Sequence, residues 1–286
     1  MLTPVLATLL ATTPAQALDL AALWDFNQPA QSEQRLRAAL AGATPDQALI
    51  LQTQIARSYG LRQDFEQARA ILTPLAAQLP TASAEVKTRY ALELGRTYAS
   101  ATHPPATQTT QAKARAGELY RQALAEARKG GLDDLAIDAL HMLAFVDTAP
   151  ADQLHWADEA LAIATTSSQP KAQKWAASLR NNKGYALHQL GRYEEALVEF
   201  QAALTLREQG DNAGAKRIAR WMVAWTLRAL KRDDEALAMQ LQLEKDCAAA
   251  GEPDPEVYTE LALLYEARGD ADKAQHYREL KERTPD

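Results

Sequence analysis

Five histidines and one cysteine are the side chains in this sequence best suited to acid–base, metal or nucleophilic chemistry. The histidines are scattered along the chain, as His103, His141, His155, His188 and His276. Asp152 and His155 are three residues apart, a spacing that places two metal ligands on one face of a helix. A third and a fourth ligand are not evident, so a surface hydrogen bond is the favoured interpretation. Cys247 has Lys245 as its basic neighbour and no nearby histidine, which predicts a buried, unreactive thiol.

The chain also lacks the short motifs that mark catalytic and nucleotide-binding sites. It contains no G-x-x-x-x-G-K-[ST] phosphate loop, no G-x-G-x-x-G, no H-E-x-x-H and no G-x-S-x-G. A single cysteine excludes an intramolecular disulfide and any thiolate-rich metal centre. We therefore expect a protein that has no enzymatic activity and no cofactor or metal.

The composition of the 286 residues favours helices and argues against two kinds of binding protein. Hydrophobic residues make up 47% of the chain but aromatic residues only 6%, so alanine and leucine, both strong helix formers, supply much of the apolar content. The 31 lysines and arginines are outnumbered by 37 acidic residues, the reverse of the basic excess typical of nucleic-acid-binding proteins. No stretch reaches the roughly 20 apolar residues that span a bilayer.

Residues 1–17 stand apart from the rest of the sequence. A short apolar run from Val5 to Ala11 is followed by a polar stretch and by Ala15-Gln16-Ala17, a pattern typical of a secretory signal with its cleavage site. The usual positive charge is missing, since the first basic residue is Arg35. We expect a signal peptide, and thus a periplasmic or secreted protein that starts at Leu18 after cleavage. The alternative is a cytoplasmic protein with an apolar start.

A helical unit recurs through most of the chain. Its clearest copy, residues 183–204, contains two amphipathic helices joined by a tight turn. Gly184 is small where the two helices must approach each other, and Phe200 belongs to the apolar stripe that faces it. The matching positions of the six copies are Ala56, Gly95, His141, Gly184, Ala224 and Ala262, at spacings of 39, 46, 43, 40 and 38 residues. Because His141 is large, we expect looser packing in the third copy.

These copies resemble the tetratricopeptide repeat, whose signature places small and aromatic residues at set points of two helices. The resemblance covers about residues 45–283 and implies an all-α fold, a right-handed α-solenoid of about six helix-turn-helix repeats. The repeats span about 45–80, 84–129, 133–167, 170–209, 213–250 and 254–283, within a solenoid of residues 45–286. The family's usual period is 34 residues, so the repeats of this chain are longer.

Two segments lie outside the regular pattern. Residues 18–44 carry two short apolar stretches, Leu18–Phe26 and Ser32–Leu40, which we expect to form N-terminal capping helices, because the end of a solenoid must cover its apolar face. Residues 100–110 hold two prolines and four threonines, which predicts a solvated loop. Such an insertion can also take part in binding.

In tetratricopeptide repeat proteins the first helix of each pair lines the concave side, so the resemblance also implies a set of groove residues. The candidate partner-binding residues are Arg57, Arg89, Arg96, Asn181, Asn182, Tyr185, His188, Trp221, Trp225 and Arg228. The first three arginines, with Glu93 as their one obvious acidic partner, favour a ligand with carboxylates. The aromatic residues suit an extended peptide, although Trp221 and Trp225 would also fill the seam between neighbouring helices.

The predicted function is a non-catalytic scaffold that binds a protein or peptide, acidic in character, along the concave face of the solenoid. The alternative is a self-associating structural or assembly component of the cell envelope, which would form homo-oligomers. A scaffold of this kind does not reveal its function by its fold, because function resides in the site that the fold carries.

Overall fold

Helices make up the regular structure of residues 18–284, the part of the chain that the computed structural model describes. The predicted signal segment, residues 1–17, lies outside the described residues. The described chain begins with α1 (Leu20–Leu23) and α2 (Pro29–Ala39). Leu20 and Leu36 are buried in one cluster with residues of the first long helix. Trp24, directly after α1, donates from Nε1 to Oε1 of Gln54 over 3.0 Å, so this segment covers the first pair of helices.

Twelve further helices follow as six pairs, with shorter helices between them. The pairs are α3 (Pro45–Leu61) with α4 (Phe65–Leu72), α5 (Ala84–Arg96) with α6 (Thr110–Gly130), α7 (Asp133–Val146) with α8 (Pro150–Thr166), α10 (Ala176–Gln189) with α11 (Tyr193–Glu208), α12 (Ala213–Ala229) with α13 (Asp233–Ala250), and α14 (Pro255–Ala267) with α15 (Ala271–Arg283). The short helices are η1 (Leu40–Gly42), η2 (Thr73–Thr81), η3 (Pro105–Thr107) and α9 (Pro170–Gln173).

The same tight turn joins the two helices of four pairs. One residue of each turn has a positive φ: Gln63 (63°), Gly191 (73°), Lys231 (60°) and Gly269 (76°). The N–H of the next residue then donates to a carbonyl five residues upstream, as from Arg192 to Leu187 over 2.9 Å. This bond closes the end of the first helix in the Schellman arrangement. Glycine adopts the left-handed conformation without a Cβ clash, and the other two turns keep it although they lack glycine.

Within two pairs, a glycine lets an aromatic ring of the second helix approach the first. A Cβ added at Gly184 would lie 2.8 Å from two ring carbons of Phe200, and one added at Gly95 would lie 2.5 Å from the ring of Tyr120. Both rings are fully buried. The small residue predicted at this point of the repeat is therefore required by the ring that covers it.

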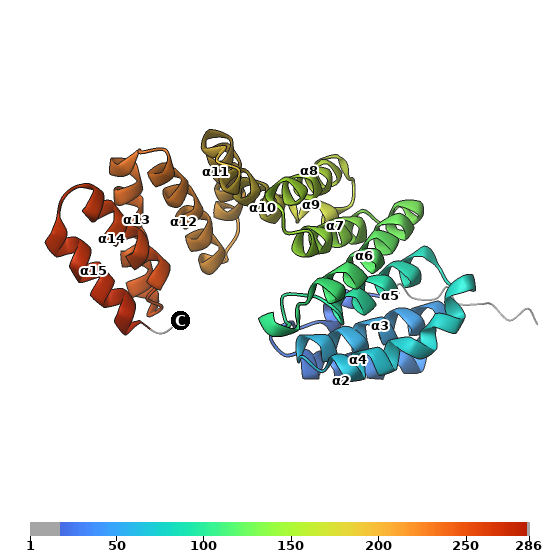
Figure 1. Ribbon diagram of the computed structural model, residues 1–286. Coiled ribbons are helices and arrows are strands. Elements are labelled where there is room, and N and C mark those ends of the chain that lie inside the picture. Colours follow the sequence, from blue (N-terminus) through green and yellow to red (C-terminus); the bar gives the residue numbers. More distant parts are fainter. Residues whose placement is uncertain (1–17, 285–286) are drawn as a thin grey trace, which may run out of the picture.

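The core runs along the solenoid as three successive clusters, because each pair buries its apolar faces against its neighbours. The clusters extend from Leu20 to Tyr90, from Ala91 to Leu179 and from Leu187 to Tyr277. The second and third meet at α10, which packs against both α8 and α11. Figure 1 shows the pairs following one another along a curved path, with the first and last pairs on two arms of an arch. The predicted all-α solenoid is thus confirmed.

The insertion at residues 100–110 is largely the solvated loop that its composition predicts, with two buried residues. Ser100 and His103 are buried. The ring of His103 stacks on Phe65 of α4, with 3.6 Å between the ring centroids, and its Nε2 lies 2.9 Å from the carbonyl oxygen of Arg96. The exposed residues, which include Pro104, Pro105 and Thr107, agree with the prediction. The two buried residues pack against helices because their hydrogen bonds are satisfied within the protein.

We expect Gly184→Ala to lower the free energy of unfolding by about 1–3 kcal/mol, because the new methyl group would overpack the ring of Phe200. Gly60→Ala is the matched control, since a Cβ at Gly60 meets nothing within 4 Å and alanine favours a helix by up to about 1 kcal/mol over glycine. Urea denaturation followed by circular dichroism measures both changes. Equal stability of the two variants would contradict the packing of α10 on α11 through this contact.

Candidate functional site: the concave groove

Three neighbouring cavities cross the first helices of consecutive pairs. The largest has a volume of about 260 Å³ and lies over α3, α5 and α7. It shares His141 and Phe145 with a second cavity of about 210 Å³. The second shares Asn181 and Asn182 with a third, of about 180 Å³, between α10 and α12. Because neighbouring cavities share wall residues, they follow one another from α3 to α12, and this row of cavities is called here the concave groove.

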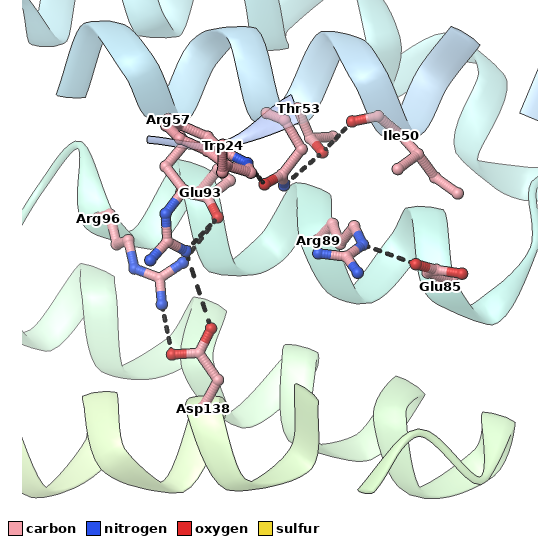
Figure 2. A network of polar contacts seen from close by, with 10 residues as sticks. Trp24, Ile50, Thr53, Arg57, Glu85, Arg89, Glu93, Arg96 and Asp138 are labelled. Atoms are coloured by element: carbon pink, nitrogen blue, oxygen red, sulfur yellow. Dashed lines mark hydrogen bonds and ion pairs between the residues drawn. The ribbon is translucent and has the colours of Figure 1, made fainter. Parts of the chain in front are cut away.

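Four charged side chains form a network at the largest cavity, shown in Figure 2. Arg57 of α3 and Arg96 of α5 both donate to Oε1 of Glu93, over 3.1 and 2.7 Å. Arg96 also donates to Oδ1 of Asp138 on α7 over 2.5 Å, and Arg57 lies 3.9 Å from the second oxygen of that carboxylate. These four residues, called the charge quartet, connect three successive helical pairs.

Two guanidinium groups face two carboxylates in the charge quartet, so its formal charges cancel. Burial opposes the ionisation of Asp138 most strongly, but Arg96 and Arg57 outweigh it and hold the pKa of Asp138 below its usual value. Burial also opposes the charge on Arg96, and Asp138 and Glu93 reverse this effect and raise its pKa. At the edge of the quartet, burial and the nearby Arg96 lower the pKa of His141 against the pull of Asp138. His141 is therefore neutral at pH 7.

The charge quartet corrects the predicted basic patch. Arg57 and Arg96 share two acidic partners, and Arg89 pairs with Glu85 on its own helix at 2.8 Å. The prediction that Glu93 is their one acidic partner was wrong, because Asp138 becomes a partner once α5 and α7 lie side by side. The argument for an acidic ligand thereby loses its premise. Figure 2 also shows that Arg89 lies apart from the quartet.

Apolar side chains form most of the remaining wall of the largest cavity. They include Met142 and Phe145 of α7 and Trp175, which directly precedes α10. The insertion contributes Ser100, Ala101 and Thr102 to the same cavity. Trp175 was missed in the sequence because it lies outside the regular strip of the repeat, whereas a binding role for the insertion had been left open.

The N-terminal segment adds an aromatic side chain beside the charge quartet. The ring of Phe26 lies 5.5 Å from the guanidinium carbon of Arg57 and stacks on Trp24, with 4.8 Å between the ring centroids. Phe26 remains 58% exposed. The sequence predicted only a capping role for this segment, and no repeat pattern could relate Phe26 to Arg57.

Two asparagines occupy the middle of the groove and line both smaller cavities. Nδ2 of Asn182 lies 3.3 Å from Nδ1 of His141, a contact that links α10 to α7. His141 therefore faces the groove rather than the interface inside its own pair, where the sequence placed it. The side chain of Asn181 makes no hydrogen bond to another residue within 18–284. Its amide can thus both donate to and accept from a ligand.

Beyond the asparagines, four ring side chains on α10 and α12 form an aromatic cluster. Trp225 stacks on His188, Trp221 and Tyr185, with centroid distances of 3.4, 5.5 and 6.1 Å. Tyr185 is exposed and also lines the second cavity, whereas both tryptophans pack partly into the third core cluster. Nε2 of His188 and Nε1 of Trp221 are buried without a hydrogen-bond partner among the described residues. The sequence left open whether the tryptophans line the groove or fill the seam between neighbouring helices. They fill this seam, and the seam lies beside the groove.

Arg228 is committed to a partner in the next helical pair. It donates from Nε and Nη2 to the two carboxylate oxygens of Glu260 on α14, over 2.6 and 2.7 Å. Glu260 is buried. Arg228 therefore bridges α12 and α14 as the charge quartet bridges the earlier helices, and it does not line the three cavities.

Part of this chain matches a known family of helical repeats. The model of the tetratricopeptide repeat family matches residues 175–245, which hold α10 to α12 and most of α13. This chain contains tetratricopeptide repeats. The predicted family resemblance is thereby confirmed. No curated protein sequence matches the chain.

Solved structures share the fold over most of the chain. The apo form of RapI is 11% identical with a TM-score of 0.69, covering 93% of this chain and 77% of RapI. A Rap protein complexed with Competence and Sporulation Factor is 14% identical with a TM-score of 0.58, covering 92% and 72%. A signal transduction ATPase with a tetratricopeptide repeat sensor, from Pyrococcus horikoshii, is 13% identical with a TM-score of 0.68, covering 89% of this chain and 38% of that one.

The histidines and Cys247 belong to no cluster with the composition of a metal centre within residues 18–284. No group of three or more histidine, cysteine or acidic residues there could hold a metal ion. Cys247 is buried, as expected, and burial raises the pKa of its thiol. Among the same residues, no helix has the length and apolar character needed to cross a membrane.

We expect Arg96→Gln to lower the free energy of unfolding by about 3 kcal/mol, because it leaves the buried carboxylates of Glu93 and Asp138 short of a partner. Arg89→Gln on the same helix is the matched control. Its side chain is 14% exposed, like that of Arg96, but it breaks only a pair within one helix, worth less than about 1 kcal/mol. Equal losses in urea denaturation would contradict a structural role for the charge quartet.

We also expect stability to depend on pH through His188. Burial, together with the nearby Arg228, lowers the pKa of His188 to about 4, whereas an unfolded chain binds this proton near pH 6.5. Between these values the unfolded state binds more protons, so the free energy of unfolding falls as the pH is lowered from about 6.5 to about 4.

The contribution of His188 to this fall is on the order of 2 kcal/mol after allowance for partial exposure. His188→Gln removes the titrating group, so the stability difference between the variant and the original chain should shrink as the pH drops. Urea denaturation at pH 7 and at pH 4.5 measures it. A difference that is the same at both pH values would refute this assignment.

Proposed function

We propose that this protein is a non-catalytic scaffold that binds an extended peptide segment of a partner protein in the concave groove. The observation that carries the proposal is the row of three cavities over the first helices of five successive pairs. A groove of this form suits a linear chain, because each repeat offers a new set of side chains along the path of the ligand.

The middle of the groove supplies the chemistry that a peptide backbone needs. An extended backbone presents N–H and C=O groups that lose water on binding and require new partners. The uncommitted amide of Asn181 offers both a donor and an acceptor. Tyr185 and Ile218 lie on either side of it along the groove, and both are exposed. They offer apolar contacts to the side chains of the same peptide.

The shared fold supports this proposal. One protein of this fold is complexed with Competence and Sporulation Factor, and the repeats of another are described as a sensor. From the sequence of residues 1–17 we separately propose export of the chain, which N-terminal sequencing of the protein from its native cells would test.

We expect Asn181→Ala to weaken peptide binding by about 3- to 10-fold, the value of one or two hydrogen bonds, while thermal unfolding stays unchanged. The probe is a set of random seven-residue peptides displayed on phage and selected on the immobilised full chain. Selected peptides are then synthesised, and their affinities are measured by fluorescence anisotropy.

Gln189→Ala serves as the control for Asn181→Ala. Gln189 ends the same helix, is exposed and lies outside the three cavities. Its replacement should leave peptide affinity unchanged. Failure to select any peptide, or an equal effect of the two variants, would count against peptide binding in the groove.

A further inference from the structure

We infer that the largest of the three groove cavities selects an uncharged apolar side chain of the bound peptide, of the size of Phe, Leu or Met, and rejects an acidic one. The inference rests on the proposed peptide binding in the concave groove and adds its specificity. It replaces the acidic ligand predicted from the arginines alone.

The charges that line the cavity balance one another. Arg57, Arg96, Glu93 and Asp138 all line it, together with the neutral His141. An acidic side chain that entered would meet both carboxylates as well as both arginines, and it would have to displace one carboxylate from its partners. A basic side chain would meet the two arginines in the same way. An uncharged group leaves every ion pair intact, whereas burying an unmatched charge is costly.

The walls and the size of the cavity suit an apolar side chain. Leu61, Met142, Phe145 and Trp175 offer apolar surface from three parts of the chain. The volume of about 260 Å³ exceeds the roughly 150 Å³ of an apolar cavity that accepts benzene. A phenylalanine or leucine side chain therefore fits, and it would remove the apolar walls from water.

The rim of the cavity offers a position at which it can be blocked. Gly60 lines it near the end of α3, and a Cβ added there meets nothing within 4 Å. Gly60→Leu therefore introduces an apolar side chain at the cavity without straining the helix. Gly42→Leu is the control, because Gly42 also has open space around its Cβ but lies outside the cavity.

The test uses the phage-displayed random peptides selected on the full chain. One peptide position should be enriched in Phe, Leu or Met. Replacing that residue by Ala or Asp should weaken binding by at least about tenfold, the effect of losing one buried apolar side chain. Gly60→Leu should weaken the Phe peptide to the level of the Ala peptide and leave the Ala peptide unaffected, and Gly42→Leu should change neither.

A second variant tests the charge argument. Asp138→Asn leaves the two arginines with one carboxylate, so a repeated selection should shift the enriched position towards Asp and Glu. Circular dichroism first establishes that this variant folds. Because Gly60→Leu leaves the quartet untouched, it tests the inference even if Asp138→Asn unfolds.

The results separate this inference from the proposed function. If peptides are selected and Asn181→Ala weakens them, peptide binding in the groove stands. The inference is then overturned by enrichment of Asp or Glu on the original chain, or by a Gly60→Leu variant that affects the Phe and Ala peptides equally. If no peptide is selected, the proposed function fails and the inference fails with it.

Discussion

No helical pair in this chain can bury its own apolar surface, so each pair depends on the next. The core consists of three clusters that follow one another along the pairs and share no common centre. This property makes a solenoid a linear structure. This dependence places the first helices of successive pairs side by side, and the groove is the surface that they present together. The N-terminal segment follows from the same constraint, because Leu20 and Leu36 cover a face that no earlier pair protects. Its Phe26, next to Arg57, then adds an aromatic ring to the groove.

Arginine on the groove side mainly connects one pair to the next. Arg57 reaches Glu93, Arg96 reaches Asp138 and Arg228 reaches Glu260, and in each case the acid lies on the first helix of the following pair. Ion pairs that are partly buried have a strict geometry, because each charge that loses water needs its partner in place. They therefore fix how one pair sits on the next, which apolar contacts alone define less sharply. The consequence for binding is that Arg57, Arg96 and Arg228 offer little free positive charge to a ligand.

The fold could be read from the sequence because its signals are local and repeat. Small residues at regular spacing, capping residues such as Thr44 with Pro45, and the turn at Gly191 all act within one or two helices. The site was predicted less well, because it depends on neighbours one repeat away. The sequence placed Arg96 on the groove side of its helix. Its pairing with Asp138, however, depends on how closely α5 packs beside α7. Trp175 was missed for the same reason, since its position follows from tertiary packing rather than from the repeat.

The two halves of the groove differ in a way that would give a peptide a direction in the proposed binding mode. The α3–α7 half combines the neutral charge quartet with the larger cavity and its apolar walls, while the α10–α12 half has smaller cavities, an uncommitted asparagine and exposed apolar side chains. An anchor side chain gains most in the first half, where it is removed from water, and backbone hydrogen bonds form in the second. A peptide that places its apolar anchor over α5 and α7 can reach Asn181 with the residues on only one side of that anchor. In the proposed binding mode, the asymmetry of the groove would therefore set which side of the anchor contacts Asn181, although no single repeat contains both features.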